Sequence, residues 1–238
     1  MFIFGQIRKM KILFISLLFI SMQAQTNFDK GELLFKQDKF ELARPLFENY
    51  LKENSANLKT LEYLGDIHGH FKNWDKAIVY YQKLKSLRPT EANYFYKYGG
   101  VLGMKAKESN KFKALSMIGD VKEAFERTIV LNPKHIEARY ALVEIYIQLP
   151  GIVGGSERKA NKYADELLRI SPIDGNLAKG RISEYFDNFR LAEKYYKNAY
   201  EMGKSKITFL KLYNLYAMKM KQPEKALLLK SEFNLQSL

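Results

Sequence analysis

The sequence contains no cysteine among its 238 residues. Disulfides, thiolate zinc sites and cysteine nucleophiles are therefore excluded, and so is the lipid-acceptor cysteine of a bacterial lipoprotein. Proline is also scarce, with only six residues. Together with abundant Tyr and Phe, at 16 each, this scarcity favours close-packed helices over a turn-rich β fold.

No apolar run reaches the roughly 20 residues that a membrane-spanning helix needs. The apolar run over residues 12–22 follows Arg8, Lys9 and Lys11 and precedes Ala24. This order is typical of a secretory signal peptide. We therefore predict that residues 1–24 are a signal peptide, that the mature chain is periplasmic or secreted, and that it has no transmembrane segment. A membrane anchor that stays attached is the alternative.

Negative charge is in short supply, because 39 Lys and Arg face 26 Asp and Glu, for a formal net charge of +13. The predicted signal peptide accounts for three of these charges and leaves +10. Such an excess favours an acidic partner or an anionic surface without identifying either.

What the sequence does contain is an internal repeat. Gly65 lies 12 residues before Ala77, and Pro89 lies 12 residues after it. The same residue types recur with a period of 34 residues, at Gly31, Phe40, Ala43 and Phe47, and again at Gly180, Phe189, Ala192, Tyr196 and Ala199.

A 34-residue period with these residue types resembles the tetratricopeptide repeat. The resemblance implies an all-α fold, a TPR-like right-handed solenoid of about six helical hairpins over residues 25–238. Glycine and alanine would lie where the two helices of a hairpin cross, and prolines would end second helices. An aromatic residue would fill the space between neighbouring hairpins, at Phe47, Tyr81, Phe125 and Tyr196.

Two repeats depart from the period. In the third, ten added residues separate Gly99 from Pro133, and the spacing of apolar residues predicts one long amphipathic helix that begins near Ser109 or Asn110. The predicted buried stripe of this helix is Phe112, Leu115, Ile118, Val121 and Phe125. In the fourth, residues 149–156 form a loop between the two helices, with Ser156 as the N-cap of the second.

The glycine-rich segment 151–156 is a weak match to a phosphate-binding loop. It lacks the Gly-Lys-Ser/Thr ending and no β-strand precedes it. We interpret it as an inter-helix loop, although contact with a partner remains open.

Nothing in the sequence forms a recognisable catalytic or metal-binding set. His68 and His70 are two residues apart, next to Asp66, whereas helical metal pairs lie four apart. We therefore predict no catalytic residue, no metal and no cofactor, and a protein that is not an enzyme.

A cluster of lysines, Lys105, Lys107, Lys111 and Lys113, surrounds Phe112. A nucleic-acid interface would need exposed aromatic residues, and we assign Phe112 to the buried stripe. The cluster is therefore interpreted as a solvated basic face with no nucleic-acid partner. An acidic protein, a glycan or a lipid headgroup remains open as its ligand.

The resemblance also implies a concave groove lined by first helices. The carboxylate clamp known in one subclass is not expected, because its Asn position holds Glu32, Asp66, Gly100, Glu144, Arg181 and Leu215. Tyrosines at groove positions suit partner contacts, since Tyr offers a rigid surface and a polar tip. The predicted partner-binding residues are Tyr96, Tyr140, Glu144, Arg181 and Tyr185, with Tyr140→Ala expected to weaken binding at least tenfold without loss of stability.

The leading functional hypothesis is an exported scaffold that binds a protein or peptide segment, possibly acidic, in its groove. An enzyme or accessory subunit of an envelope complex is one alternative, and an adhesion module for anionic surfaces is another. The last hairpin, which contains residues 226–229 and Phe233, has no further helix to cover it before Leu238. We expect a second copy or a partner to cover this end. In the alternative, its leucines all face the fifth repeat.

Overall fold

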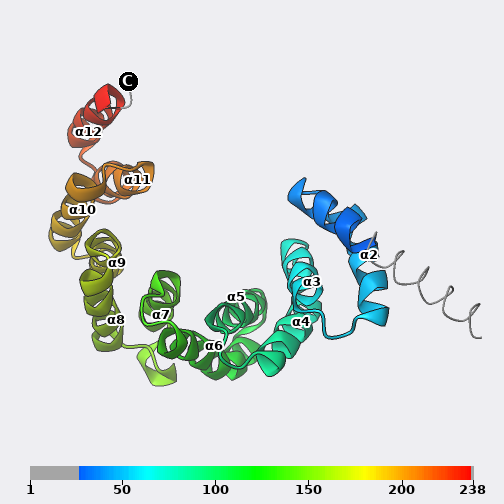
Figure 1. Cartoon of the computed structure of the whole chain (residues 1–238). Coiled ribbons are helices and arrows are strands. Elements are labelled where there is room, and N and C mark those ends of the chain that lie inside the picture. Colours follow the sequence, from blue (N-terminus) through cyan, green and yellow to red (C-terminus); the bar gives the residue numbers. More distant parts are fainter. Residues whose placement is uncertain (1–26, 237–238) are drawn as a thin grey trace, which may run out of the picture. The chain divides into compact units, whose positions relative to one another are not determined.

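The computed structural model describes residues 27–236, and every regular element in that range is helical (Figure 1). The all-α prediction is therefore confirmed. The predicted signal peptide, residues 1–24, lies outside the described residues. No helix in the described part is long and apolar enough to cross a membrane.

Within the described range the helices follow one another in six consecutive pairs, as predicted, and divide into two compact units on either side of the Met117–Ile118 boundary. In unit 1, residues 27–36 are helical and α2 to α5 follow. The bounds there are α2 (Phe40–Glu53), α3 (Leu58–His70), α4 (Trp74–Leu87) and α5 (Ala92–Glu108). Helix α6 (Lys111–Leu131) contains the boundary.

Unit 2 continues with helices that pack against their neighbours in chain order. Its elements are α7 (Ile136–Gln148), the 3-10 turn η1 (Gly151–Val153), α8 (Glu157–Ile170), α9 (Pro172–Tyr185), α10 (Phe189–Gly203), α11 (Lys206–Asn214), the π-helical turn η2 (Leu215–Lys219) and α12 (Pro223–Gln236).

Helix crossings explain the recurring glycines. A Cβ atom on Gly65 would lie 2.7 Å from the Tyr81 ring, and one on Gly180 would lie 2.4 Å from the Tyr196 ring. Both tyrosines are fully buried. Only a residue without a side chain lets the aromatic ring of the second helix lie against the first, which is the role that the repeat pattern predicts.

The turn inside a hairpin has a feature that the repeat pattern did not reveal. One non-glycine residue adopts the left-handed conformation there, with φ of 57° at Asp38, 56° at Lys72, 57° at Asp187 and 53° at Lys221. These positions keep the 34-residue period within each unit. The turn therefore repeats in conformation where it does not repeat in residue type.

The long helix of the third repeat is present, but its predicted buried stripe is wrong at its start. Asn110 caps α6, because its side chain accepts a hydrogen bond from the Lys113 amide at 3.0 Å. Phe112 is 89% exposed, and the first buried residue of α6 is Val121. A helix of 21 residues outruns the 13- and 14-residue helices of this chain, so one of these cannot cover it along its whole length.

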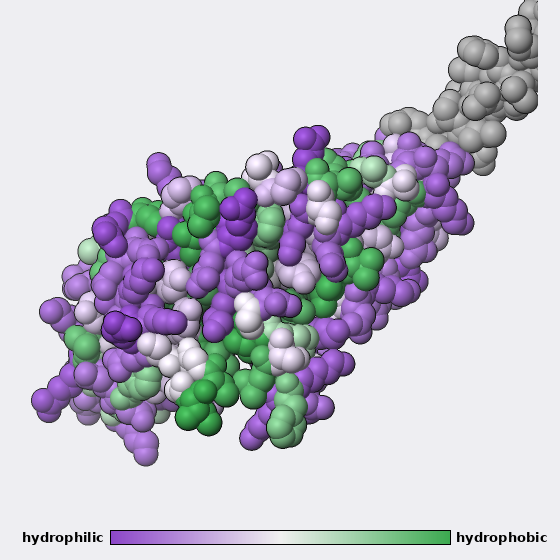
Figure 2. Space-filling model, turned by 90° about the horizontal axis from the view of Figure 1, so that it is seen from below, coloured by the Kyte–Doolittle hydropathy of each residue, from purple (hydrophilic) through white to green (hydrophobic). Residues whose placement is uncertain are grey.

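The last hairpin buries only one side of α12. Ala226 and Leu229 are buried in a core cluster with Tyr200 and Leu212, whereas Leu227 is 64% and Leu228 is 70% exposed. The alternative in which these leucines all face the fifth repeat is therefore wrong. Elsewhere the surface is mostly hydrophilic with separate hydrophobic patches, as the face in Figure 2 shows.

Candidate functional site

In unit 2 the first helices of two successive repeats, α7 and α9, pack against each other. Positions four residues apart on α7 bring Tyr140 and Glu144 to one face, and Arg181 and Tyr185 do the same on α9. Arg181 joins the two helices through Glu144, with Nε 2.8 Å from Oε1 and Nη2 3.2 Å from Oε2. Burial alone would lower the pKa of Arg181, but the hydrogen bonds and charge of Glu144 raise it.

Tyr140 faces the core more than the sequence predicted. Its half-buried ring packs against the core cluster of unit 2 that contains Tyr196 and Tyr200. Burial, and then the nearby Glu144 carboxylate, raise the pKa of Tyr140 to about 12. The expectation that Tyr140→Ala leaves stability unchanged is therefore wrong, since truncation would leave a cavity in this cluster. Removing only its hydroxyl, as Tyr140→Phe, is the safer probe of binding.

Tyr185 is the most accessible of the predicted anchors in unit 2. Its side chain is 40% exposed, and the Arg181 guanidinium lies 5.5 Å from its ring centre. Phe186 is 45% exposed and packs edge-on against Tyr185 at 5.2 Å. The groove positions missed Phe186 because it follows α9 as its C-cap. Two adjacent aromatic residues before the left-handed Asp187 were the available signal.

Tyr96 lies on α5 in unit 1, where it is half-buried. Its neighbour Lys97 reaches the previous first helix, with Nζ 3.0 Å from Glu62 Oε1 and 2.8 Å from Asp66 Oδ2. Asp66 also accepts a short hydrogen bond from the Tyr81 hydroxyl. The carboxylates at groove positions in unit 1 are thus bound within the protein, as Glu144 is in unit 2.

The two histidines of α3 take part in packing. His68 is 1% exposed, neither ring nitrogen has a hydrogen-bond partner, and the ring stacks on Tyr80 at 5.6 Å. His70 packs against Phe40, with ring centres 4.6 Å apart. Within the described range, no three His, Asp or Glu side chains are grouped so that they could hold a metal ion.

The glycine-rich loop of the fourth repeat has its backbone donors in use. The amides of Gly154 and Gly155 bond to the carbonyls of Gly151 and Pro150 at 3.1 Å, and the Ser156 amide bonds to Tyr146 at 2.9 Å. These amides therefore do not form the cradle of a phosphate-binding loop. As predicted, Ser156 caps α8, and its hydroxyl accepts from the Lys159 amide at 3.2 Å.

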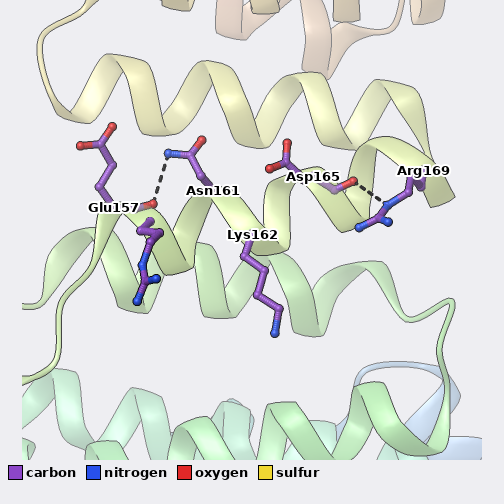
Figure 3. Close-up of a pocket in the computed structure, with 6 residues that line it drawn as sticks. Glu157, Asn161, Lys162, Asp165 and Arg169 are labelled. Atoms are coloured by element: carbon purple, nitrogen blue, oxygen red, sulfur yellow. Dashed lines mark hydrogen bonds between the residues drawn. The ribbon is translucent and has the colours of Figure 1, made fainter.

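Helix α8 borders a shallow hollow, whose lining residues point to different sides of the helix (Figure 3). Lys179 of α9 already occupies two of them, with Nζ 2.9 Å from Asn161 Oδ1 and 2.7 Å from Asp165 Oδ1. The hollow is open and carries both signs of charge, unlike the enclosed pocket with convergent groups that is expected of an enzyme. It is lined by Glu157, Arg158, Asn161, Lys162, Asp165 and Arg169.

Residues 28–92 match the family model of the tetratricopeptide repeat. No curated protein matches the chain closely enough in sequence to count as a relative. The fold is similar to that of TTC0263, a thermophilic TPR protein of Thermus thermophilus, with 14% identity over 82% of this chain and 100% of that one and a TM-score of 0.62.

Two further solved structures share the fold. A tetratricopeptide repeat protein of Parabacteroides merdae is 16% identical over 89% of this chain and 78% of its own, with a TM-score of 0.66. YrrB, described as a TPR protein with an unusual peptide-binding site, is 16% identical over 76% of this chain and 87% of its own, with a TM-score of 0.55.

Proposed function

Because this chain is a tetratricopeptide repeat protein, we propose that it is a scaffold that binds a segment of another protein on the first-helix face of unit 2. The observation that carries this proposal is the exposed aromatic pair Tyr185 and Phe186 next to the Glu144–Arg181 ion pair. Large, rigid aromatic side chains contribute most of the binding energy in protein interfaces. The similarity in fold to YrrB is consistent with peptide binding without specifying it.

The partner segment is recognised chiefly through apolar and aromatic contacts. Glu144 and Arg181 already satisfy each other, and a ligand that competed for either would leave the other without its partner. Breaking such a pair on one side costs more than the pair contributes. The aromatic rings have no such conflict, so an extended or helical segment with apolar side chains fits this face. The positive net charge favours acidic residues around those side chains.

Site-specific photocrosslinking tests this assignment. A photoreactive phenylalanine analogue at position 185 should give crosslinked species with proteins of the envelope fraction. The same analogue at Val79, which is 63% exposed on the second helix α4, is the matched control. Equal crosslinking at both positions, or none at position 185, would contradict the proposal. Once the partner is identified, Tyr185→Ala should weaken its binding about tenfold or more.

We further propose that the protein acts outside the cytoplasm, after cleavage near Ala24. The basis is the order of Arg8, Lys9 and Lys11, the apolar run and Ala24. N-terminal sequencing of the native protein should begin near Gln25. A chain that keeps its N-terminus and fractionates with the cytoplasm would contradict export.

A further inference from the structure

The junction of α5 and α6 in unit 1 presents an apolar ring to solvent. Phe112, in the first turn of α6, is 89% exposed, and Leu115, three residues later on the same side of the helix, is 40% exposed. Exposed lysines, Lys111 and Lys113, flank the ring in the chain. One exposed apolar residue is ordinary on a protein surface, so the significance of this ring depends on the charges around it.

Those charges are predominantly positive. Lys105 forms an ion pair with Asp75, and Lys72 lies 3.5 Å from Glu108. These two lysines offset the two carboxylates of the junction. Three more lysines remain, and all are exposed: Lys107, Lys111 and Lys113.

The same contacts hold the junction in place. The Trp74 indole donates to Glu108 at 2.6 Å, which links the start of α4 to the end of α5. The Lys105–Asp75 ion pair makes a second link between these helices. Asn110 fixes the start of α6 through its bond to the Lys113 amide. The ring and the three lysines are therefore presented from a braced helix end.

We propose that this junction, consisting of Phe112, Leu115, Lys107, Lys111 and Lys113, docks on the surface of an anionic phospholipid bilayer. The Phe112 ring enters the interface between headgroups and acyl chains, and the lysines lie among the anionic headgroups. This contact is separate from the Tyr185 face. It stands whether or not that face binds a peptide.

The chemistry of the side chains favours a bilayer over other anionic partners. Phe has no polar tip, so it gains only from transfer into an apolar medium, and a bilayer accommodates a protruding ring without a preformed pocket. Lysine is a strongly hydrated point charge on a flexible stem, which suits mobile headgroups. Single-stranded nucleic acid would be expected to use several stacking rings along a basic groove. The junction offers one ring at a helix end.

The expected affinity is modest and depends on charge. Each lysine near an anionic surface contributes about fivefold in binding, so three lysines contribute about a hundredfold. Burial of one phenylalanine ring adds about tenfold or more. The attraction should weaken with salt, because charges at an exposed surface are screened.

A local fluorescent reporter tests the proposal in the full-length chain. Since the chain has no cysteine, Ser116→Cys provides one labelling site, one turn beyond Phe112, for a polarity-sensitive dye. The dye should shift to the blue with vesicles of phosphatidylcholine and phosphatidylglycerol, and not with phosphatidylcholine alone. A dye at Ser86→Cys, an exposed serine on α4 with a similar hydrogen bond to its own helix backbone, should not shift. An equal shift at both positions, or with neutral vesicles, would overturn the proposal.

Variants separate the junction from the overall charge. The pair Lys111→Glu and Lys113→Glu should weaken anionic-vesicle binding at least tenfold, and Phe112→Ser about tenfold. The controls are Lys83→Glu with Lys230→Glu, which changes the net charge equally, and Ile152→Ser, since Ile152 is 96% exposed outside the junction. Controls that weaken binding as much as the junction variants would refute the assignment. A dye shift with soluble polyglutamate but not with anionic vesicles would also refute it, in favour of an acidic protein.

Discussion

His68 is the residue whose surroundings couple folding to pH. Its ring is buried on α3, and burial lowers its pKa from 6.5, with Lys76 and Arg44 acting in the same direction and Glu48 against it. The unfolded chain therefore binds a proton at His68 more readily than the folded chain does. The stabilisation is fully present above the unfolded pKa of about 6.5 and is lost as the pH falls through it towards the lower folded value.

The first prediction is a fall in stability between about pH 7 and pH 5.5, measured as the thermal unfolding midpoint by circular dichroism. His68→Phe should make that fall shallower, because it removes the titrating ring and keeps its stacking on Tyr80. His135 contributes to whatever dependence remains, since burial also lowers its pKa and its Nδ1 accepts from the Ala138 amide. An unaltered slope in His68→Phe would show that His68 is not the coupled group.

A second prediction concerns Lys221, which holds the left-handed conformation with φ of 53° in the turn before α12. A left-handed backbone costs a residue with a side chain roughly 1 kcal/mol or more, whereas glycine adopts it freely. Lys221→Gly should therefore raise the free energy of unfolding by about 0.5 kcal/mol, after the entropy lost by glycine is subtracted. Urea denaturation measures the change. Lys83→Gly, inside α4, should instead lower stability by about 1 kcal/mol.

At the scale of helices, the same substitution should have opposite effects at two glycines. Gly180→Ala would drive a Cβ into the Tyr196 ring, which is fully buried and hydrogen-bonded to Glu184 at 2.8 Å. We expect a loss of about 1–3 kcal/mol. Gly100→Ala meets nothing within 4 Å inside α5, so it should gain about 0.5–1 kcal/mol. Equal effects in urea denaturation would mean that α9 and α10 do not cross as described.

At the scale of the whole molecule, the exposed side of α12 predicts self-association. Leu227 and Leu228 are 64% and 70% exposed on the last helix, and an end hairpin without a neighbour leaves its outer face uncovered. Sedimentation velocity should show a dimer that forms as concentration rises, and Leu227→Lys with Leu228→Lys should abolish it. A strictly monomeric protein at high concentration would contradict this prediction. Circular dichroism of the double variant is the control for folding.

The repeat was readable from the sequence because it depends on local chemistry. Glycine where two helices cross, an aromatic residue to fill the crossing and proline after a helix recur at fixed spacing whatever else the chain does. The all-α class, the paired helices, the start of α6 and the Ser156 cap all follow from such short-range signals. The positions of the candidate anchors could be transferred in the same way, because a helical face repeats along the chain.

Tertiary contacts determined how far each of those side chains is buried. Periodicity assigned Phe112 to a buried stripe, but burial needs a neighbour and the start of α6 is exposed. Tyr140 proved to pack against the core, and Glu144 proved to be bound by Arg181, because contacts between repeats join residues far apart in the sequence. A sequence pattern fixes which side of a helix a residue occupies, and only the packing around that helix determines what lies opposite.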